Sequence, residues 1–395
     1  QGYITQEEHD AAIADDVYAR IQTVNIEKSE TKPTSYFSDA LADQVIEDLM
    51  TKLNYSDTQA YNALYSGGLK IYATQDAAIQ SICDEEVNNN SNYPSSIYVG
   101  VDYALTITRA DGTLENYSSG HLKKFGDQQY GDKQGRLFSS EEKAQARIDE
   151  FRASVSKEDD LNYDERIEFS PQPQASVVVM DQHTGHVKAI VGGRGEKKSS
   201  RSLNRATDSP RAPGSSFKIV GVYAPALDSA GQSLGTVTKD EPFERNGKKF
   251  KNAYSGFMGN ITMRTAIQHS VNITALKTFE KITPKLGLDY ARKLGLSTLV
   301  DSEEINGAIY SDLALPAALG GLTHGVYNLE MAGAYAAIAN GGVYNRPIFY
   351  TKIEDHDGNV LIDNSSESTA VLRESTAYLL TSAMQDVMTK GTATY

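Results

Sequence analysis

A Pro-Gly break followed at once by a long apolar run constrains the fold of this chain more than any other feature. Residues 211–218 read Arg-Ala-Pro-Gly-Ser-Ser-Phe-Lys, and the apolar run extends from Phe217 to Leu227. A Pro-Gly pair interrupts regular structure and a long apolar run is typical of a buried element, so the pattern predicts a loop that enters a buried helix. Two polar side chains, Ser215 and Lys218, stand at the start of this helix.

The spacing of Ser215 and Lys218 indicates chemistry. Residues three apart lie on one face of a helix, so the amine can reach the hydroxyl. Desolvation lowers the pKa of an amine, and a neutral amine can take the proton of an attacking serine. The alternative is that Ser215 is only a helix N-cap and Lys218 lies on the helix surface. Taken alone, the four-residue pattern favours this alternative.

Composition excludes several classes of function. A length of 395 residues allows two or three domains of roughly 100–200 residues. The net charge of −14 argues against a general nucleic-acid binder. No apolar stretch of about 18 residues is present, so we expect no transmembrane helix in this sequence. The single cysteine, Cys83, is expected to be a small buried residue, and no His-x-x-x-His pair occurs, so no metal site is predicted.

The first ninety residues predict mostly helices. Helices are expected over residues 1–22, with a capping-box pattern at Thr5, and over 35–53, with a polar linker over 25–34 between them. A glycine turn then leads into a short strand within residues 67–74, and a further helix begins near Asp76.

Residues 96–174 have a different texture. The segment 96–116 is rich in β-branched and aromatic residues and contains Asp111-Gly112, which predicts a β-hairpin. The highly charged segment 141–164 predicts a solvated helix with few apolar anchors, on a small accessory domain. The Ser-Pro-Gln-Pro-Gln run over 170–174 indicates a domain boundary.

After this boundary, short strands and helices alternate. Two hairpins are expected, one over 176–191 and one over 348–362. Helices are expected over 262–269, 274–281, 284–294, 328–340 and 374–389. Residues 194–218 carry seven Lys or Arg against two Asp or Glu, which is a local charge of +5. A basic lip beside a nucleophile would suit a substrate with a carboxylate, and an ordinary solvated loop is an equal alternative.

A second polar motif, Ser270-x-Asn272, follows Ser215 by 55 residues on the loop expected between two helices. Alone it would indicate a helix cap. Together with Ser215-x-x-Lys218 it resembles the motif set of penicillin-binding proteins and serine β-lactamases. The flanking sequence resembles the class A penicillin-binding proteins, which are bifunctional enzymes of bacterial cell-wall synthesis, in these segments: 67–74, 177–193, 204–207, 211–218 and 319–342.

This resemblance covers nearly the whole chain and implies its architecture. The expected fold is α/β (α+β), with a central antiparallel sheet flanked by helices as in penicillin-binding proteins and serine β-lactamases. Residues 1–34 would be the tail of a glycosyltransferase domain and a linker. Residues 35–170 would form an interdomain linker or pedestal region with an insertion at about 95–170, and residues 171–395 the transpeptidase domain.

The resemblance also implies a D,D-transpeptidase that cross-links peptidoglycan. Ser215 would attack the carbonyl of the penultimate D-alanine, Lys218 would accept its proton, and Ser270 would pass a proton to the leaving D-alanine. Asn272 would hold the amide of the substrate, and the backbone N–H of Ser215 would form half of an oxyanion hole. β-Lactams would acylate Ser215, and no cofactor is implied.

For the whole protein, the resemblance implies a second, glycosyltransferase activity. The expected partners are peptidoglycan stem peptides and glycan strands derived from lipid II, with no nucleic acid. The start of the sequence reads as the middle of a protein, so we expect an upstream segment that anchors it to the membrane. The expected location is the extracytoplasmic face of the bacterial cell membrane.

One departure from the family pattern is the third motif, Lys-Thr/Ser-Gly. The sequence ends shortly after Lys390-Gly391-Thr392, which has the same letters in another order. The motif would supply a sheet-edge strand and the second oxyanion donor, so the transpeptidase fold is expected to lack its C-terminal strands and its activity to be impaired. A serine β-lactamase and a non-catalytic module that senses β-lactams or binds the wall are the alternatives; the first would need a deacylating glutamate, and none is recognisable after Asn272.

Overall fold

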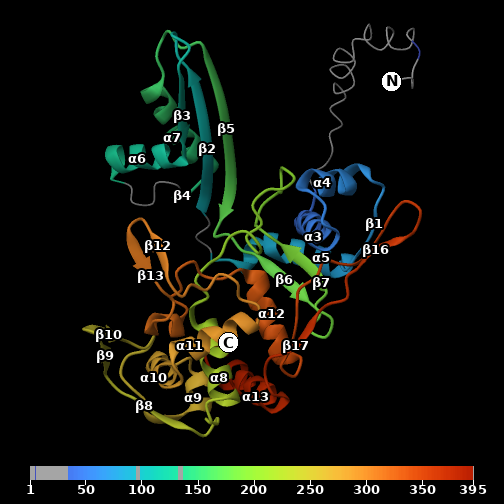
Figure 1. The fold of residues 1–395 in the computed structure, drawn as a ribbon. Coiled ribbons are helices and arrows are strands. Elements are labelled where there is room, and N and C mark those ends of the chain that lie inside the picture. The colour runs from blue at the N-terminus through green and yellow to red at the C-terminus, as the bar shows by residue number, and fades with distance from the viewer. Residues whose placement is uncertain (1–4, 6–33, 95–97, 132–136, 395) are drawn as a thin grey trace.

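The computed structural model describes residues 5, 34–94, 98–131 and 137–394. The helix predicted over 1–22 and nearly all of the linker predicted over 25–34 lie outside these residues. Figure 1 shows a mixed helical and stranded chain, in which β2, β3 and β5 with α6 and α7 form a unit set apart from the helices near the C-terminal end. Among the described residues, no helix has both the length and the apolar composition needed to cross a membrane.

The helix α3 is the first element of the described chain. It spans Tyr36–Leu53, as predicted, because the Ser35 side chain accepts a hydrogen bond from the Ser38 N–H and Asn54 ends the helix in a left-handed conformation (φ 56°). A further helix, α4 (Asp57–Ser66), was not predicted although Ser56 and Gln59 form a capping box. Both helices therefore have local sequence signals at their ends.

Two antiparallel sheets lie beside α3. The strand β1 (Lys70–Ala73) pairs with β15 (Tyr350–Glu354), which also pairs with β16 (Val360–Asp363). The second sheet is the predicted hairpin of β6 (Val177–Met180) and β7 (Val187–Val191). The two sheets meet where the Val187 N–H donates to the carbonyl of Ile348, 2.9 Å away. The expected antiparallel sheet is therefore present, in two connected parts.

Helices cover these sheets. The helix α5 (Ala77–Asn88) packs Cys83 and Val87 against Ala189 and Val191 of β7. Cys83 is buried, as predicted. On α3, Phe37 is buried with Ile190 and Phe349, and Val45 and Leu49 are buried with the β15–β16 hairpin. Residues from both ends of the described chain thus form one core.

Residues 98–172 form a separate antiparallel sheet around β2 (Tyr98–Thr108). This strand pairs with β3 (Leu114–Ser118), β4 (Leu137–Phe138) and β5 (Asn162–Gln172). Alternate residues of β2 are buried, and they pack with α6 (Ser119–Tyr130) and α7 (Glu141–Val155): Val101, Tyr103, Leu105 and Ile107. The hairpin predicted at Asp111-Gly112 is confirmed.

The helix predicted over 141–164 is wrong in its second half. The helix α7 ends at Val155, and β5 begins at Asn162 and pairs with β2 as far as Gln172. The predicted helix therefore overlaps β5 only at residues 162–164. Further along β5, beyond the predicted helix, Ile167 and Phe169 alternate with polar residues and pack on the covered face. The helix also has more apolar anchors than predicted, since Ala144, Ile148 and Phe151 are all buried.

The remaining residues build the helical part of the fold, and its predicted helices are confirmed. They are α9 (Met263–Gln268), α10 (Asn272–Ile282), α11 (Pro284–Lys293), α12 (Asn328–Ala339) and α13 (Glu374–Lys390). Their shared core contains Leu276 and Phe279, each 0% exposed. Short strands connect the helices: β8 (Val237–Asp240) with β11 (Gly259–Thr262), β9 (Phe243–Arg245) with β10 (Lys248–Phe250), β12 (Glu303–Ile305) with β13 (Ala308–Tyr310), and β14 (Val343–Asn345) with β17 (Ser368–Ala370).

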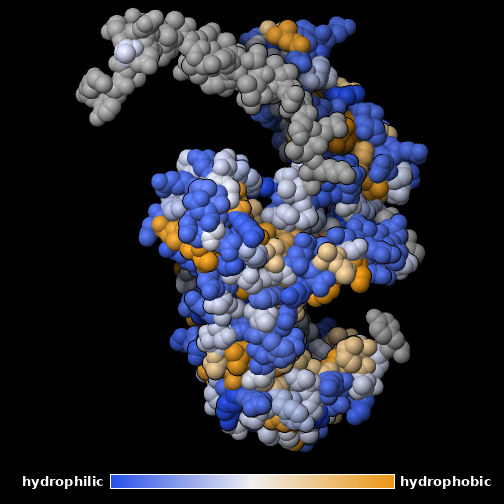
Figure 2. All heavy atoms as spheres, turned by 90° about the vertical axis from the view of Figure 1, so that its right-hand side faces the viewer, coloured by the Kyte–Doolittle hydropathy of each residue, from blue (hydrophilic) through white to orange (hydrophobic). Residues whose placement is uncertain are grey.

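The surface is mostly polar on the face that Figure 2 shows, and its hydrophobic side chains lie in small separate groups. This pattern agrees with a chain in which the apolar side chains are used in several internal clusters.

The core of the 98–172 unit can be tested through Phe151. Its ring packs edge-on against Tyr103, Tyr117 and Phe125, and it is 4% exposed. We expect Phe151→Ala to destabilise this unit by about 3–5 kcal/mol, because it leaves a cavity among three aromatic rings.

Hydrogen exchange measures this effect residue by residue. Faster exchange in β2 and β5 with unchanged exchange in α10 is the expected result, because the unit has its own hydrophobic cluster. Faster exchange throughout the chain would contradict the independence of that cluster.

Candidate active site

The turn that carries Ser215 begins at Gly214, whose φ of +58° suits glycine. Residues Gly214–Ser216 form a 3₁₀ turn, and Lys218–Tyr223 continue as a π-helix before α8 (Ala224–Asp228). The sequence predicted an ordinary buried helix here, and the burial is confirmed, but the first turns are wound differently. π-Helical turns occur frequently at functional sites. Ser215 is exposed, while every residue of the π-helix is buried.

The buried amine of Lys218 is the centre of the site. Lys218 is 2% exposed, and its Nζ donates to the Ser270 carbonyl (2.7 Å), the Ser270 hydroxyl (3.1 Å) and Asn272 Oδ1 (2.6 Å). Burial lowers the pKa of this amine to about 8. The structure therefore brings Lys218, Ser270 and Asn272 into direct contact. Among the described contacts of Nζ, none is with the Ser215 hydroxyl, although both groups line one cavity.

The loop between α9 and α10 aims Ser270 at Lys218. Ser270 has a φ of +50°, an unfavourable conformation for a residue other than glycine that costs roughly 1–3 kcal/mol. Its N–H closes the end of α9 on the Ile267 carbonyl at 3.0 Å. Asn272 is the first residue of α10, and its Nδ2 donates to the Lys251 carbonyl at 2.9 Å.

The cavity at Ser215 has a volume of about 330 Å³. Its polar side is formed by Ser215, Ser216, Lys218 and Ser270, and its other walls are mostly apolar: Ile219, Tyr223, Ile267, Tyr335, Met384, Val387 and Met388. Thr392 lies at the rim, where its N–H donates to the Gln268 carbonyl at 3.3 Å. The segment Lys390-Gly391-Thr392 is thus folded against α9 beside the cavity.

Sequence reasoning missed the apolar walls of this cavity. Tyr335 of α12 lines it and donates its hydroxyl to the Ser216 carbonyl at 2.9 Å. Met384 and Met388 of α13 line it from the other side. In the sequence these residues look like ordinary helix positions, and only the packing of α12 and α13 brings them to Ser215.

The basic segment does not form a lip at Ser215. Lys218 is the one charged side chain among the described residues that line the Ser215 cavity. Lys197 instead pairs with Asp39 at 2.7 Å, and Arg201 pairs with Asp43 at 2.8 Å. The interpretation as a basic lip is wrong because five of the seven cations line a different cleft: Arg194, Lys197, Lys198, Arg201 and Arg205.

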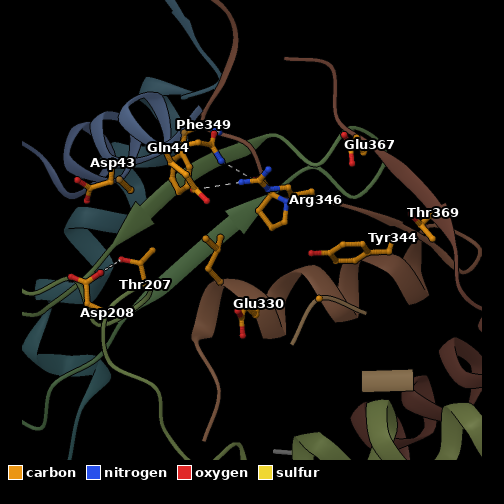
Figure 3. Close-up of a pocket in the computed structure, with 15 residues that line it drawn as sticks. Asp43, Gln44, Thr207, Asp208, Glu330, Tyr344, Arg346, Phe349, Glu367 and Thr369 are labelled. Carbon is orange, nitrogen blue, oxygen red and sulfur yellow. Dashed lines mark hydrogen bonds and ion pairs between the residues drawn. The ribbon is translucent and has the colours of Figure 1, made fainter. Parts of the chain in front are cut away.

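A larger cavity of about 570 Å³ lies elsewhere, among α3, α12 and the residues around Arg346 (Figure 3). Two of its carboxylates are engaged within the protein: Asp208 accepts from Thr207, and Glu330 accepts from Ser297. Gln44 connects α3 to the Phe349 N–H at 2.9 Å across this cavity. In the described part of the chain, no cluster of three or more His, Cys, Asp or Glu side chains is arranged to hold a metal ion. The smaller cavity, with its buried amine, is therefore the candidate active site.

Two glycines, Gly320 and Gly325, pack against the backbone of the segment that carries Ser215. Arg211 and Val326 exchange both backbone hydrogen bonds, at 2.9 and 2.8 Å. Gly320 has a φ of +77°, and a Cβ atom there would lie 2.4 Å from the Gly214 nitrogen. Gly325 has a φ of +81°, and a Cβ atom there would lie 2.3 Å from the carbonyl carbon of Arg211. The segment 319–326 thus supports the turn by backbone contact, which explains why glycines are needed there.

Comparison with known proteins now identifies the family. Residues 175–395 match the family described as the penicillin binding protein transpeptidase domain. The chain belongs to this family. Its predicted resemblance to the C-terminal portion of class A penicillin-binding proteins is confirmed.

The penicillin-binding protein relatives are longer than this chain. It is 29% identical over 373 residues to penicillin-binding protein 1A of Clostridium acetobutylicum, which covers 91% of this chain and 37% of that protein. It is 35% identical over 221 residues to penicillin-binding protein 1F of Bacillus subtilis, which covers 56% of this chain and 29% of that protein. The chain thus spans less than half the length of these relatives.

Solved penicillin-binding proteins share the fold. PonA1 of Mycobacterium tuberculosis has a TM-score of 0.57 and 18% identity, over 89% of this chain and 70% of that one. Penicillin-binding protein 1A of Haemophilus influenzae has a TM-score of 0.57 and 17% identity, over 100% of this chain and 62% of that one. The predicted fold class, with antiparallel sheets flanked by helices, is confirmed.

The support of the Ser215 turn can be tested by Gly320→Ala. We expect a loss of stability and faster hydrogen exchange at residues 214–216, because the new methyl group would displace the Gly214 backbone. The matched control is Gly307→Ala, since Gly307 has a nearly equal φ of +79° but nothing within 4 Å of the added Cβ. The control should lose only the roughly 1–2 kcal/mol of a left-handed residue. Equal destabilisation by both substitutions would show that the backbone contact is unimportant.

Proposed function

We propose that this chain carries a peptidoglycan D,D-transpeptidase site, in which Ser215 forms an acyl-enzyme with stem peptides that end in D-Ala-D-Ala. The observation that carries the proposal is the buried Lys218 amine, which shares a cavity with Ser215 and donates to Ser270 and Asn272. A serine beside a lysine with a lowered pKa is an activated nucleophile of the kind that acyl transfer requires, because the neutral amine can take the proton of the hydroxyl. Membership of the penicillin-binding protein transpeptidase family supports this assignment.

In the proposed acylation, Ser215 Oγ attacks the carbonyl carbon of the penultimate D-alanine as its proton passes to the neutral Lys218 amine. The amide bond to the last D-alanine then breaks, and Ser270 relays a proton from Lys218 to the leaving amine. Its hydroxyl lies 3.1 Å from Lys218 Nζ, which is within the reach of one proton transfer. An amine of a neighbouring stem peptide then attacks the ester on Ser215, forms the cross-link and releases the serine.

The backbone and Asn272 would hold the substrate during these steps. The Ser215 N–H lies in the first turn of a helical stretch, where N–H groups have no acceptor within the helix, and it can donate to the developing oxyanion. Asn272 Nδ2 carries two N–H groups, of which one is donated to Lys251. We assign the other to the amide of the substrate.

The apolar lining argues against a serine β-lactamase. A class A enzyme of that kind needs a glutamate that activates water for deacylation. Among the described residues that line the Ser215 cavity, none is Asp or Glu. The other alternative is a non-catalytic module that senses β-lactams or binds the wall. The lifetime of the acyl-enzyme in the presence of an acceptor amine distinguishes such a module from a transpeptidase. Fast release to the amine indicates a transpeptidase, and slow release indicates a sensor.

For the whole protein we propose a class A penicillin-binding protein with an additional glycosyltransferase activity. The supporting observation is the likeness to penicillin-binding protein 1A of Clostridium over most of this chain. Its partners would be stem peptides, glycan strands derived from lipid II, and β-lactams as covalent inhibitors. PonA1 of Mycobacterium tuberculosis has been solved in complex with penicillin V. An anchor in the membrane, with the domains on its extracytoplasmic face, follows from the same likeness.

We also propose a division of the chain at about residue 171, with residues 1–34 as the end of the glycosyltransferase domain and its linker. The family match begins at residue 175, and residues 98–172 have their own hydrophobic cluster. Residues 35–94 share clusters with β7 and β15, so this part of the pedestal region and the transpeptidase domain would unfold together.

The nucleophile can be identified with a fluorescent penicillin. We expect Ser215→Ala to abolish covalent labelling of the intact protein, because it removes the hydroxyl that we propose as the nucleophile of the cavity shared with Lys218. Ser216→Ala is the matched control, since Ser216 is a neighbouring exposed serine whose hydroxyl donates to the Pro213 carbonyl at 2.7 Å. Labelling that survives Ser215→Ala, or that mass spectrometry maps to another residue, would refute the assignment.

The pH dependence of acylation tests Lys218. The amine acts as a base only when neutral, and its pKa is lowered to about 8, so the rate should rise with pH and level off above that value. Near pH 7 roughly a tenth of the amine is neutral, and each lower unit of pH should cost roughly tenfold in rate. Lys218→Arg should abolish the reaction, because guanidinium stays charged. A rate that does not change between pH 6 and pH 9 would contradict this role.

A further inference from the structure

A chain of hydrogen-bonded polar groups, buried at both ends and half-buried between them, runs from the β8 strand to Lys218. Asp240 ends β8, is 1% exposed, and accepts from Asn252 Nδ2 at 2.8 Å, the Tyr254 hydroxyl at 2.7 Å and the Met258 N–H at 2.8 Å. Burial, together with this carboxylate, raises the pKa of the Tyr254 hydroxyl above its ordinary value, so the hydroxyl remains a donor. All three groups donate to one buried carboxylate.

Asn252 connects Asp240 to the start of α10 by hydrogen bonds. Its Oδ1 accepts from the backbone N–H groups of Asn272 (3.0 Å) and Ile273 (3.2 Å). The first N–H groups of a helix have no acceptor within the helix, and the N-cap residue, Val271, has no side chain that could serve. Asn252, some twenty residues upstream, therefore caps the helix whose first residue accepts the hydrogen bond from Lys218.

The orientation of the Asn252 amide is fixed by chemistry. A carboxylate only accepts hydrogen bonds and a backbone N–H only donates them. The Nδ2 of Asn252 must therefore face Asp240, and its Oδ1 must face α10. Turning the amide over would bring donor against donor and acceptor against acceptor at the same time.

We propose that Asp240 and Asn252 are positioning residues of the transpeptidase site. Asp240 orients Asn252, and Asn252 holds the first turn of α10 so that Asn272 and the adjacent Ser270 meet the Lys218 amine. Neither residue lines the Ser215 cavity, so they act through Asn272 and Ser270. This inference rests on the proposed function of Ser215 and Lys218, and it assigns to the 240–258 segment a part in acylation.

Exchange of the two side-chain types provides the test. In Asp240→Asn, the oxygen of the new amide accepts from Tyr254 and Met258, and its NH₂ group faces Asn252. Asn252 must then turn its own oxygen toward residue 240 and its NH₂ group toward α10, where it meets N–H groups that are also donors. In Asn252→Asp, two carboxylates face each other. In the double variant Asp240→Asn/Asn252→Asp, the amide at 240 donates to the carboxylate at 252, which still accepts from α10. Every donor again meets an acceptor.

We expect each single substitution to lower the first-order rate constant of penicillin acylation about 100-fold, because a displacement of about 1 Å at reacting groups has an effect of that size. The double variant should recover most of the loss. Variants with Asn252→Asp carry a negative charge nearer to Lys218, which would change the pKa of its amine. The rate is therefore measured on the intact protein at the plateau of the pH profile of each variant, where the amine is neutral. Asn260→Asp is the matched control: Asn260 is exposed on β11 and has no side-chain hydrogen bond in the described structure.

Thermal unfolding separates positioning from a purely structural role. Variants that are folded at the assay temperature, acylate slowly when single and recover when double would support the proposal. Folded single variants that acylate at the unaltered rate, or a folded double variant that stays as slow as the singles, would overturn it. Ser215→Ala reports separately on the proposed function: labelling that survives in that variant refutes the nucleophile, whereas its loss together with unaffected Asp240 variants refutes only the positioning role.

Discussion

A buried amine needs hydrogen-bond acceptors, and in this protein the acceptors of Lys218 come from a loop more than fifty residues away. An ammonium group in an apolar interior is costly unless it is paired or neutral. Here the loop supplies a carbonyl and two side-chain oxygens, and burial still lowers the pKa to about 8. The amine is thus held in place while it remains able to lose its proton. The backbone is irregular on both sides of these contacts, with π-helical winding over 218–223 and a left-handed Ser270.

Much of the fold could be predicted from local sequence. The helices near the C-terminus have clear periodicity, and α3 has a capping serine, so their bounds agree with the structure within a few residues. The helix predicted over 141–164 extended past the end of α7 into the first residues of β5, because the charged residues after Val155 give no clear sign of where the helix ends. Pairing with β2 decides the conformation of β5, and such a long-range contact leaves no local signal.

The site was predicted in part. Ser215, Lys218, Ser270 and Asn272 were named from spacing and resemblance, and the structure gathers them around one cavity and its lysine. Spacing along a regular helix suggested that the amine would meet Ser215 directly, but the helix is not regular there and the amine turns to Ser270. Asn252 and Asp240 could not be found, because a polar residue in a loop between short strands looks like any other until its partners are known.

The pairing of Tyr98 with Gln172 has a consequence for how such proteins change over time. These residues stand opposite each other at the end of the β2–β5 ladder, and opposite residues in an antiparallel pair have Cα atoms only about 5 Å apart. The two ends of the 98–172 unit, where it joins the sheets and helices around Ser215, therefore lie side by side. A unit attached in this way can be lengthened, replaced or lost without opening the sheets and helices that hold Ser215. The 98–172 unit is thus an insertion whose two ends meet, so a change in its length need not reach the elements that hold Ser215.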